Sequence, residues 1–274
     1  MSLTLVRFAL SLLLLCPIAL LGQQVDPLSL TSLKLLILHD NVQIGSATGT
    51  VLLKGSHHYL LTNRHVVLAC TEDKNANNVG GWLCANKLVI TYLRNDHHGW
   101  IPAIEDLYDA QNNKRWLEHP TLQTAAGSIP GSSIDLIALP LTQTQGADLV
   151  PLNLELAGTQ ILLGPSESVS IVGFPLGLGA NEGLPLWKNG TIASDLDVDY
   201  EGKERFLLDT TSRAGMSGAP VYAKRTGSYS TASTLISVGN ATKFLGIYSE
   251  QSERAEIGIV WKAIVVKRLY DSLP

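Results

Sequence analysis

The sequence predicts an all-β protein that ends in an α-helix, because short apolar or β-branched runs recur along the chain and the last segment has a helical pattern. Glycine, proline and polar residues separate the runs, as is typical of strands joined by turns. Many short strands at intervals favour a sandwich or a barrel. The expected strands are residues 33–39, 47–54, 58–62, 87–93, 134–139, 168–173, 189–194, 205–210, 218–223, 234–239 and 243–248.

The segment 259–270 departs from the β pattern. Its apolar residues share one helical face, and the basic Lys267 and Arg268 follow where the negative end of a helix favours cations. We therefore expect an amphipathic helix that packs on the β body. The residues of the apolar face are Val260, Trp261, Ile264, Val265 and Leu269.

Two stretches lack a clear pattern. Residues 141–167 are rich in Gln, Thr, Gly and Pro, and they are the best candidate for a linker between two halves. Residues 94–133 are polar, which predicts long loops with one short helix near 104–110.

The composition excludes several classes of protein. Of 274 residues, 45% are hydrophobic and 16% are charged, whereas a disordered chain requires low hydrophobicity and high charge. The 24 acidic residues outnumber the 20 basic ones, so the chain lacks the basic surface that binds phosphate backbones, and no nucleic-acid partner is expected. The length leaves room for one large domain or two small ones.

Residues 1–22 have the pattern of a signal peptide. Arg7 supplies a positive charge, and the apolar residues 8–21 are fewer than the roughly 20 that a membrane-spanning helix needs. Cleavage is expected after Gly22, which predicts a secreted or periplasmic protein. If the leader stays uncleaved, it would instead anchor the chain in a membrane.

Export affects the interpretation of the cysteines. Cys16 would leave with the leader, so Cys70 and Cys84 remain. An even pair in an oxidising compartment predicts a disulfide, and two free thiols in a reducing compartment are the alternative.

Two of the three segments that carry chemistry lie in the first half of the chain. In LTNRHVV, residues 61–67, a polar cluster follows an apolar strand and places His65 at the strand end. In SIDLIAL, residues 133–139, Asp135 is a single acid inside an apolar run, and a partly buried carboxylate needs partners. Each alone also fits a structural histidine or an aspartate that caps a turn.

The third segment is TSRAGMSGAPV, residues 211–221, where Ser217 lies in a turn between Gly215 and Gly218. Such a turn can expose a nucleophile while backbone N–H groups point at one spot, and glycine permits both, although a turn of this kind also occurs by chance. Together the three segments supply a base for the nucleophile and an acid to orient the base.

TNRHV around His65, DLIAL at Asp135 and GMSGAPV around Ser217 resemble the chymotrypsin-like (trypsin superfamily) serine peptidases, in particular their bacterial trypsin-like branch. The resemblance implies two six-stranded antiparallel β-barrels with the site between them. Residues 23–155 would form the first barrel with His65 and Asp135, and residues 156–274 the second barrel with Ser217 and the terminal helix.

The resemblance also implies a role for each residue. Ser217 would be the nucleophile, His65 the general base and Asp135 the group that holds the imidazole tautomer. The backbone N–H groups of Gly215 and Ser217 would form the oxyanion hole. The expected substrate is a polypeptide, cleaved through an acyl-enzyme, and no cofactor is expected.

The substrate pocket departs from the family's best-known patterns. Thr211 stands where tryptic members carry an aspartate, and no histidine follows Ser217 to receive a glutamate side chain. Thr211, Ser249 and Gln251 are expected to line the pocket. Glu250 and Gln251 replace residues that are often small in the family, so we expect a shortened, uncharged pocket that accepts small to medium neutral side chains.

Other functions fit some of these features. The pairs His57-His58 and His97-His98 suggest a metal site, but adjacent strand residues point to opposite faces and no complete ligand set is visible, so no metal is expected. A catalytically silent relative that keeps the fold as a binding module is one alternative. An esterase with the same three residues is another.

Overall fold

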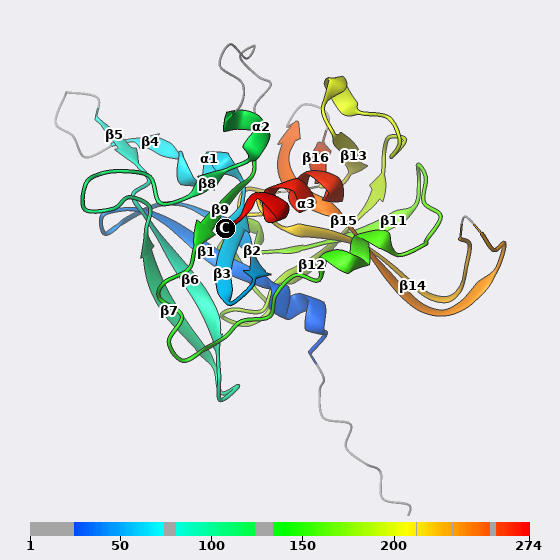
Figure 1. Cartoon of the computed structure of the whole chain (residues 1–274), viewed down its shortest axis with the longest axis horizontal. Coiled ribbons are helices and arrows are strands. Elements are labelled where there is room, and N and C mark those ends of the chain that lie inside the picture. Colours follow the sequence, from blue (N-terminus) through cyan, green and yellow to red (C-terminus); the bar gives the residue numbers. More distant parts are fainter. Residues whose placement is uncertain (1–24, 74–80, 124–133, 212, 232, 253–255) are drawn as a thin grey trace, which may run out of the picture.

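The computed structural model describes residues 25–73, 81–123, 134–211, 213–231, 233–252 and 256–274. The expectation of a mostly β protein is confirmed, since strands dominate and the helices are few and short (Figure 1). The leader expected over residues 1–22 lies outside the described residues. Within the described residues, no helix is long and apolar enough to span a membrane.

The first half of the chain forms an eight-stranded antiparallel sheet. Its strands run in the order β10-β6-β1-β2-β3-β9-β8, and β7 pairs with β6. Short strands lie at its edges: β8 and β10 have two residues each. The bounds are β1 Ser32–His39, β2 Val42–Lys54, β3 His57–Thr62, β6 Lys87–Arg94, β7 Trp100–Asp106, β8 Leu117–Glu118, β9 Ile137–Pro140 and β10 Ala147–Asp148.

The second half of the chain forms a closed antiparallel barrel in the order β11-β12-β13-β16-β15-β14. Pairing between β11 and β14 closes the ring. The two segments expected as strands 234–239 and 243–248 contribute to one long strand, β15. The bounds are β11 Ser168–Gly173, β12 Leu186–Ile192, β13 Arg205–Asp209, β14 Pro220–Tyr229, β15 Ser237–Ser252 and β16 Ile257–Lys262.

These pairings give one closed barrel and one eight-stranded sheet, where the family resemblance implies two six-stranded barrels. Among the described residues, the ladder of the first half does not return on itself, because β10 and β8 are short and lie at opposite ends of the strand order. The division into domains at residues 155 and 156 stays a prediction.

The helix predicted over 259–270 is partly wrong. Val260 and Trp261 belong to β16, which pairs with both β13 and β15, and the helix α3 spans Ala263–Ser272. An apolar run fits a fully buried strand as well as a helical face, and β16 is buried at four successive positions. The helix buries Val265, Val266 and Leu269.

The long loops expected over 94–133 are also partly wrong. Residues 100–106 form the strand β7, so the short helix expected near 104–110 does not form there. Among the described strands, β7 pairs with β6 alone. It is half solvated, which weakens its apolar signal, and an edge strand tolerates Pro102. The helix α2, Pro120–Gln123, follows β8.

One apolar cluster joins the two halves. It combines Leu61 of β3 and Leu136 with Val172 and Ile247 of the barrel, and α3 packs into it through Val265. The helix therefore covers the junction between the eight-stranded sheet and the barrel (Figure 1).

The predicted disulfide is confirmed. Cys70 in β4, Cys70–Glu72, is bonded to Cys84 in β5, Trp82–Cys84, and the two residues face each other across this two-stranded ladder. The ladder follows the short helix α1, Arg64–Val67, so the disulfide closes a loop that begins shortly after His65.

Candidate active site

His65 lies where β3 gives way to α1. The apolar residues Leu60 and Leu61 keep β3 in the core, and the extended Asn63 then turns the chain into α1. The His65 side chain is 47% exposed, so it stands at the surface at the end of a buried strand. The sequence predicted this position.

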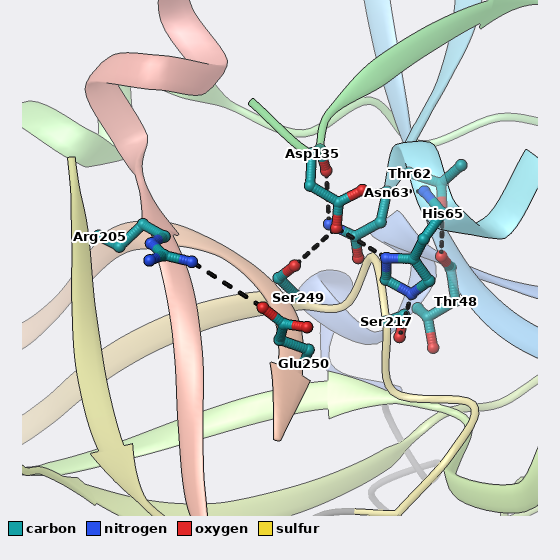
Figure 2. Close-up of polar contacts among 9 residues, drawn as sticks. All are labelled: Thr48, Thr62, Asn63, His65, Asp135, Arg205, Ser217, Ser249 and Glu250. Carbon is teal, nitrogen blue, oxygen red and sulfur yellow. Dashed lines mark hydrogen bonds and ion pairs between the residues drawn. The ribbon is translucent and has the colours of Figure 1, made fainter. Parts of the chain in front are cut away.

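Asp135 holds His65 through two bonds. Its Oδ2 lies 2.7 Å from His65 Nδ1, and its Oδ1 accepts a hydrogen bond of 2.8 Å from the His65 backbone N–H. The Asp135 carbonyl accepts further bonds from Asn63 Nδ2 at 2.8 Å and from the Arg64 backbone N–H at 3.3 Å. The aspartate thus fixes both the imidazole ring and the start of α1 (Figure 2).

Ser217 completes a chain of polar contacts. Its Oγ lies 3.0 Å from His65 Nε2 (Figure 2). Because an ionised carboxylate only accepts hydrogen bonds, the Asp135 contact places the neutral ring's proton on Nδ1 and leaves the Nε2 lone pair facing Ser217. The structure thus brings together the three residues that the sequence singled out, from two different sheets.

The turn around Ser217 depends on two glycines. Gly215 has φ 96° and Gly218 has φ 89°, both in the region that favours glycine. A side chain at Gly215 would collide with the Phe174 carbonyl, and one at Gly218 with the Thr48 carbonyl. The backbone N–H groups of Gly215 and Ser217 donate to no residue in the described part of the chain.

The environment raises the pKa of His65 above its ordinary value. Burial is the largest single effect and acts to lower the pKa, but the hydrogen bond and the charge of Asp135 and the charge of Glu250 together outweigh it. The imidazolium form is therefore favoured by two carboxylates, one in contact and one nearby.

A cavity of about 480 Å³ lies beside His65 and Asp135. Arg205 reaches it from β13 with a side chain that is 7% exposed, stacks on Trp261, and has Nη1 3.9 Å from Glu250 Oε1 (Figure 2). The lining residues are His65, Asp135, Lys203, Arg205, Ser249, Glu250 and Trp261.

The expected pocket residues lie apart. Ser249 is buried and lines this cavity, and its Oγ donates a hydrogen bond to Asp135. Thr211 is exposed and does not line the cavity. The side chain of Gln251 lies outside the described residues, so the expected narrowing of the pocket stays a prediction. Glu250 extends toward Arg205.

Some residues of the site went unassigned in the sequence. Asn63 belongs to the polar cluster before His65, and its side chain donates a hydrogen bond to the Asp135 carbonyl. Thr48 is fully buried in β2 and contacts the turn of Ser217. The available signal was a pair of threonines that flank Gly49 inside an apolar strand. Among the residues that the structure describes, no group of three His, Cys, Asp or Glu side chains is placed to hold a metal ion.

Comparison with solved structures finds weak similarities to proteases. The serine endoprotease from Yersinia pestis is 16% identical with a TM-score of 0.48, and the match covers 89% of this chain and 64% of that one. A mutant of the tobacco etch virus protease is 15% identical with a TM-score of 0.45, covering 90% and 78%. A thermostable serine protease from an extremophilic microorganism is 13% identical with a TM-score of 0.46, covering 90% and 97%.

The chain thus spans less than two thirds of the Yersinia pestis enzyme, and each of these TM-scores is below 0.5, so the family assignment does not depend on these structures. No curated protein matches the chain. The family model of the trypsin-like peptidase domain matches residues 47–229, which is more than half of the sequence and includes His65, Asp135 and Ser217. The chain belongs to the trypsin-like peptidase family.

Proposed function

We propose that this protein is a serine endopeptidase in which Ser217 attacks the peptide carbonyl, His65 is the general base and Asp135 orients His65. The observation that carries the proposal is the position of His65 between the two other residues, with Nδ1 2.7 Å from Asp135 Oδ2 and Nε2 3.0 Å from Ser217 Oγ. A nucleophile within reach of a base, and a base oriented by a third group, is the arrangement that activates a serine hydroxyl.

In the first half-reaction, His65 Nε2 takes the proton of Ser217 Oγ as the oxygen bonds to the carbonyl carbon. Asp135 stabilises the imidazolium through Nδ1. The carbonyl oxygen becomes an oxyanion and accepts from the N–H groups of Gly215 and Ser217. His65 then gives its proton to the leaving amine, and the peptide bond breaks to leave an acyl-enzyme. In the second half-reaction, His65 takes a proton from water as the water oxygen bonds to the acyl carbon. The bond from that carbon to Ser217 Oγ then breaks, His65 gives the proton to Oγ, and the acid leaves.

Two alternatives use the same fold. A binding module would not need an aligned acid, base and hydroxyl, so the contacts of His65 favour the enzyme. An esterase would share the chemistry and differ only in the residues that receive the substrate. Membership of a peptidase family favours a polypeptide substrate.

We propose cleavage after small to medium neutral residues, with Ser249 and Gln251 on the pocket wall. The proposal keeps the sequence argument that Thr211 stands where a tryptic pocket carries its anion, although Thr211 itself does not line the cavity beside His65. A clash excludes a larger side chain, whereas each methylene that fits contributes about 1–3 kcal/mol.

The same proposal includes export, with residues 1–22 removed and the mature chain acting outside the cytoplasm. The disulfide between Cys70 and Cys84 supports this, because such bonds persist in oxidising compartments. The mature chain would comprise one unit over 23–155 and another over 156–274.

A fluorophosphonate probe tests the proposal directly, because it labels only an activated serine. The mature protein should gain one adduct by intact mass, located on Ser217 by peptide mapping, and should cleave a peptide library. Ser217→Ala should take no label and lose on the order of 10⁶ in turnover. Labelling without peptide cleavage, together with ester hydrolysis, would favour the esterase. An unlabelled wild type would favour the binding module.

A further inference from the structure

Thr48 belongs to the eight-stranded sheet but contacts the turn that carries Ser217 in the barrel. It lies in β2 and is fully buried. Its hydroxyl donates a hydrogen bond of 2.8 Å to the Gly215 carbonyl and accepts one of 3.0 Å from the Phe174 N–H. Its own backbone N–H donates to the Ser217 carbonyl at 2.9 Å.

These bonds complete the support of the whole turn. The carbonyl of Ala214 accepts from Leu176 N–H at 2.6 Å, and that of Met216 accepts from Ala219 N–H at 2.9 Å. The Gly218 carbonyl accepts from Thr50 Oγ1 at 3.3 Å. With the two bonds from Thr48, every carbonyl from residue 214 to residue 218 is held.

Fixed carbonyls also fix the N–H groups. In a trans peptide the N–H points opposite the carbonyl of the same peptide plane. The Ala214 carbonyl therefore sets the direction of the Gly215 N–H, and the Met216 carbonyl sets that of the Ser217 N–H. The peptide plane between these two carries the Gly215 carbonyl, and this carbonyl accepts its hydrogen bond from the hydroxyl of Thr48.

The hydrogen bond from Thr48 matters because the residue that it holds is a glycine. Glycine adopts positive and negative φ about equally well, so the chain itself does little to keep Gly215 at φ 96°. Without the hydroxyl, the peptide plane of the Gly215 carbonyl would keep only the 3.3 Å hydrogen bond from its Met216 N–H to the Arg213 carbonyl among the described residues. The planes of the Gly215 and Ser217 N–H groups adjoin it on either side, so a rotation of this plane would strain the direction of both donors. The other contact of the hydroxyl, the N–H of Phe174, would lose its buried acceptor at the same time.

We propose that Thr48 is a positioning residue that pre-organises the oxyanion hole through its hydroxyl. Thr62 supports it in turn, since Thr62 Oγ1 donates to the Thr48 carbonyl at 2.9 Å (Figure 2). The inference rests on the proposed function, because an oxyanion hole matters only if Ser217 forms an acyl-enzyme.

Thr48→Val tests the role, because it keeps the shape of the side chain and removes the hydroxyl. Loss of one oxyanion-hole donor costs about 10²–10³ in rate, so loss of its support should lower kcat by about 10–10² while KM stays within about threefold. The inhibition constant of a peptide aldehyde, whose adduct places an oxyanion in the hole, should rise by the same factor. Thr48→Ser keeps the hydroxyl and should restore most of kcat.

Thr31→Val is the matched control. Thr31 is also buried, and its hydroxyl contacts the Leu28 carbonyl at 2.8 Å and Tyr222 Oη at 3.2 Å, so it also joins the first half to the barrel. This variant should lose stability and keep kcat. If Thr48→Val does not fold, Gly173→Ala is a second variant, because the added methyl carbon would lie 2.7 Å from Thr48 Oγ1 and would displace the hydroxyl, together with Ala219 Cβ at 2.9 Å in the same turn. It should reproduce the kcat defect.

The outcomes are distinct. A labelled, active wild type with an unchanged kcat in Thr48→Val would overturn the inference and leave the proposed function standing. Thr48→Ser as inactive as Thr48→Val would overturn it too, since the methyl group would then matter. A kcat loss in Thr31→Val equal to that in Thr48→Val would show that general destabilisation lowers kcat, and it would also overturn the inference. An unlabelled wild type would overturn the proposed function and the inference together.

Discussion

Ser249 Oγ donates a hydrogen bond of 2.7 Å to Asp135 Oδ2, the same oxygen that contacts His65 Nδ1 (Figure 2). Ser249 is buried and lies in β15 of the barrel, whereas Asp135 precedes β9 of the sheet. The aspartate is therefore held from both halves of the molecule. A residue expected in the substrate pocket is thus in contact with the acid of the proposed triad.

Ser249→Ala should raise the pKa of His65 further. Removing a donor from Asp135 Oδ2 leaves more negative charge on the oxygen that faces the imidazolium. Because a hydrogen bond contributes about 0.5–1.5 kcal/mol net, kcat should fall by no more than about tenfold. The acid limb of the pH profile of kcat/KM should move to higher pH. A limb that moves to lower pH would contradict the account of Asp135.

Asp135→Asn should keep the fold and lose roughly 10⁴ in kcat. The amide can donate to Nδ1, which favours the tautomer with its proton on Nε2, and that proton faces Ser217 instead of a lone pair. Circular dichroism checks the fold, and steady-state kinetics measure the loss. Activity near that of the wild type would mean that another group orients His65.

Glu250→Gln should make the enzyme active at lower pH. The charge of Glu250 helps to raise the pKa of His65, and His65 acts as a base only when it is neutral. Activity is therefore lost as pH falls through that pKa, and the loss should occur at lower pH once the charge is gone. The pH profile of kcat/KM measures the shift.

Glu201→Gln is the control for that shift. Glu201 also pairs with Arg205, with Oε2 2.7 Å from Nη2, but its charge does not contribute to the pKa of His65. An equal shift in both variants would assign the effect to Arg205 and not to Glu250.

Removing the disulfide should destabilise the protein. Cys70 and Cys84 are 14 residues apart, and a loop of this length contributes about 3 kcal/mol on the chain-entropy account. The double variant Cys70→Ser, Cys84→Ser should lower the free energy of unfolding by about that amount in a denaturant titration. An unchanged midpoint and slope would show that the bridge does not constrain the unfolded chain.

The sequence predicted most strands because each depends on a local apolar run, as in β1 and β11. It failed where one pattern fits two structures: Val260 and Trp261 suit a helical face as well as the buried strand β16. It also failed at β7, whose polar, half-solvated residues resemble a loop.

The site divides in the same way. The segments around His65, Asp135 and Ser217 stand out because each places a polar residue beside an apolar strand. The contact between Thr48 and Gly215 joins residues 167 positions apart, and no local sequence pattern predicts it. The bond between Ser249 and Asp135 spans 114 positions, so the sequence could not predict it either.

The cluster that contains Leu61, Leu136, Val172 and Ile247 has a mechanical consequence. It lies at the junction across which Ser217 must stay in reach of His65, and close-packed interiors transmit strain because they compress little. A misplacement of about 1 Å can cost about 10² in rate. The distance between the proposed nucleophile and base thus depends on the stiffness of this core, and we expect thermal fluctuations between the sheet and the barrel to interrupt catalysis before either one unfolds.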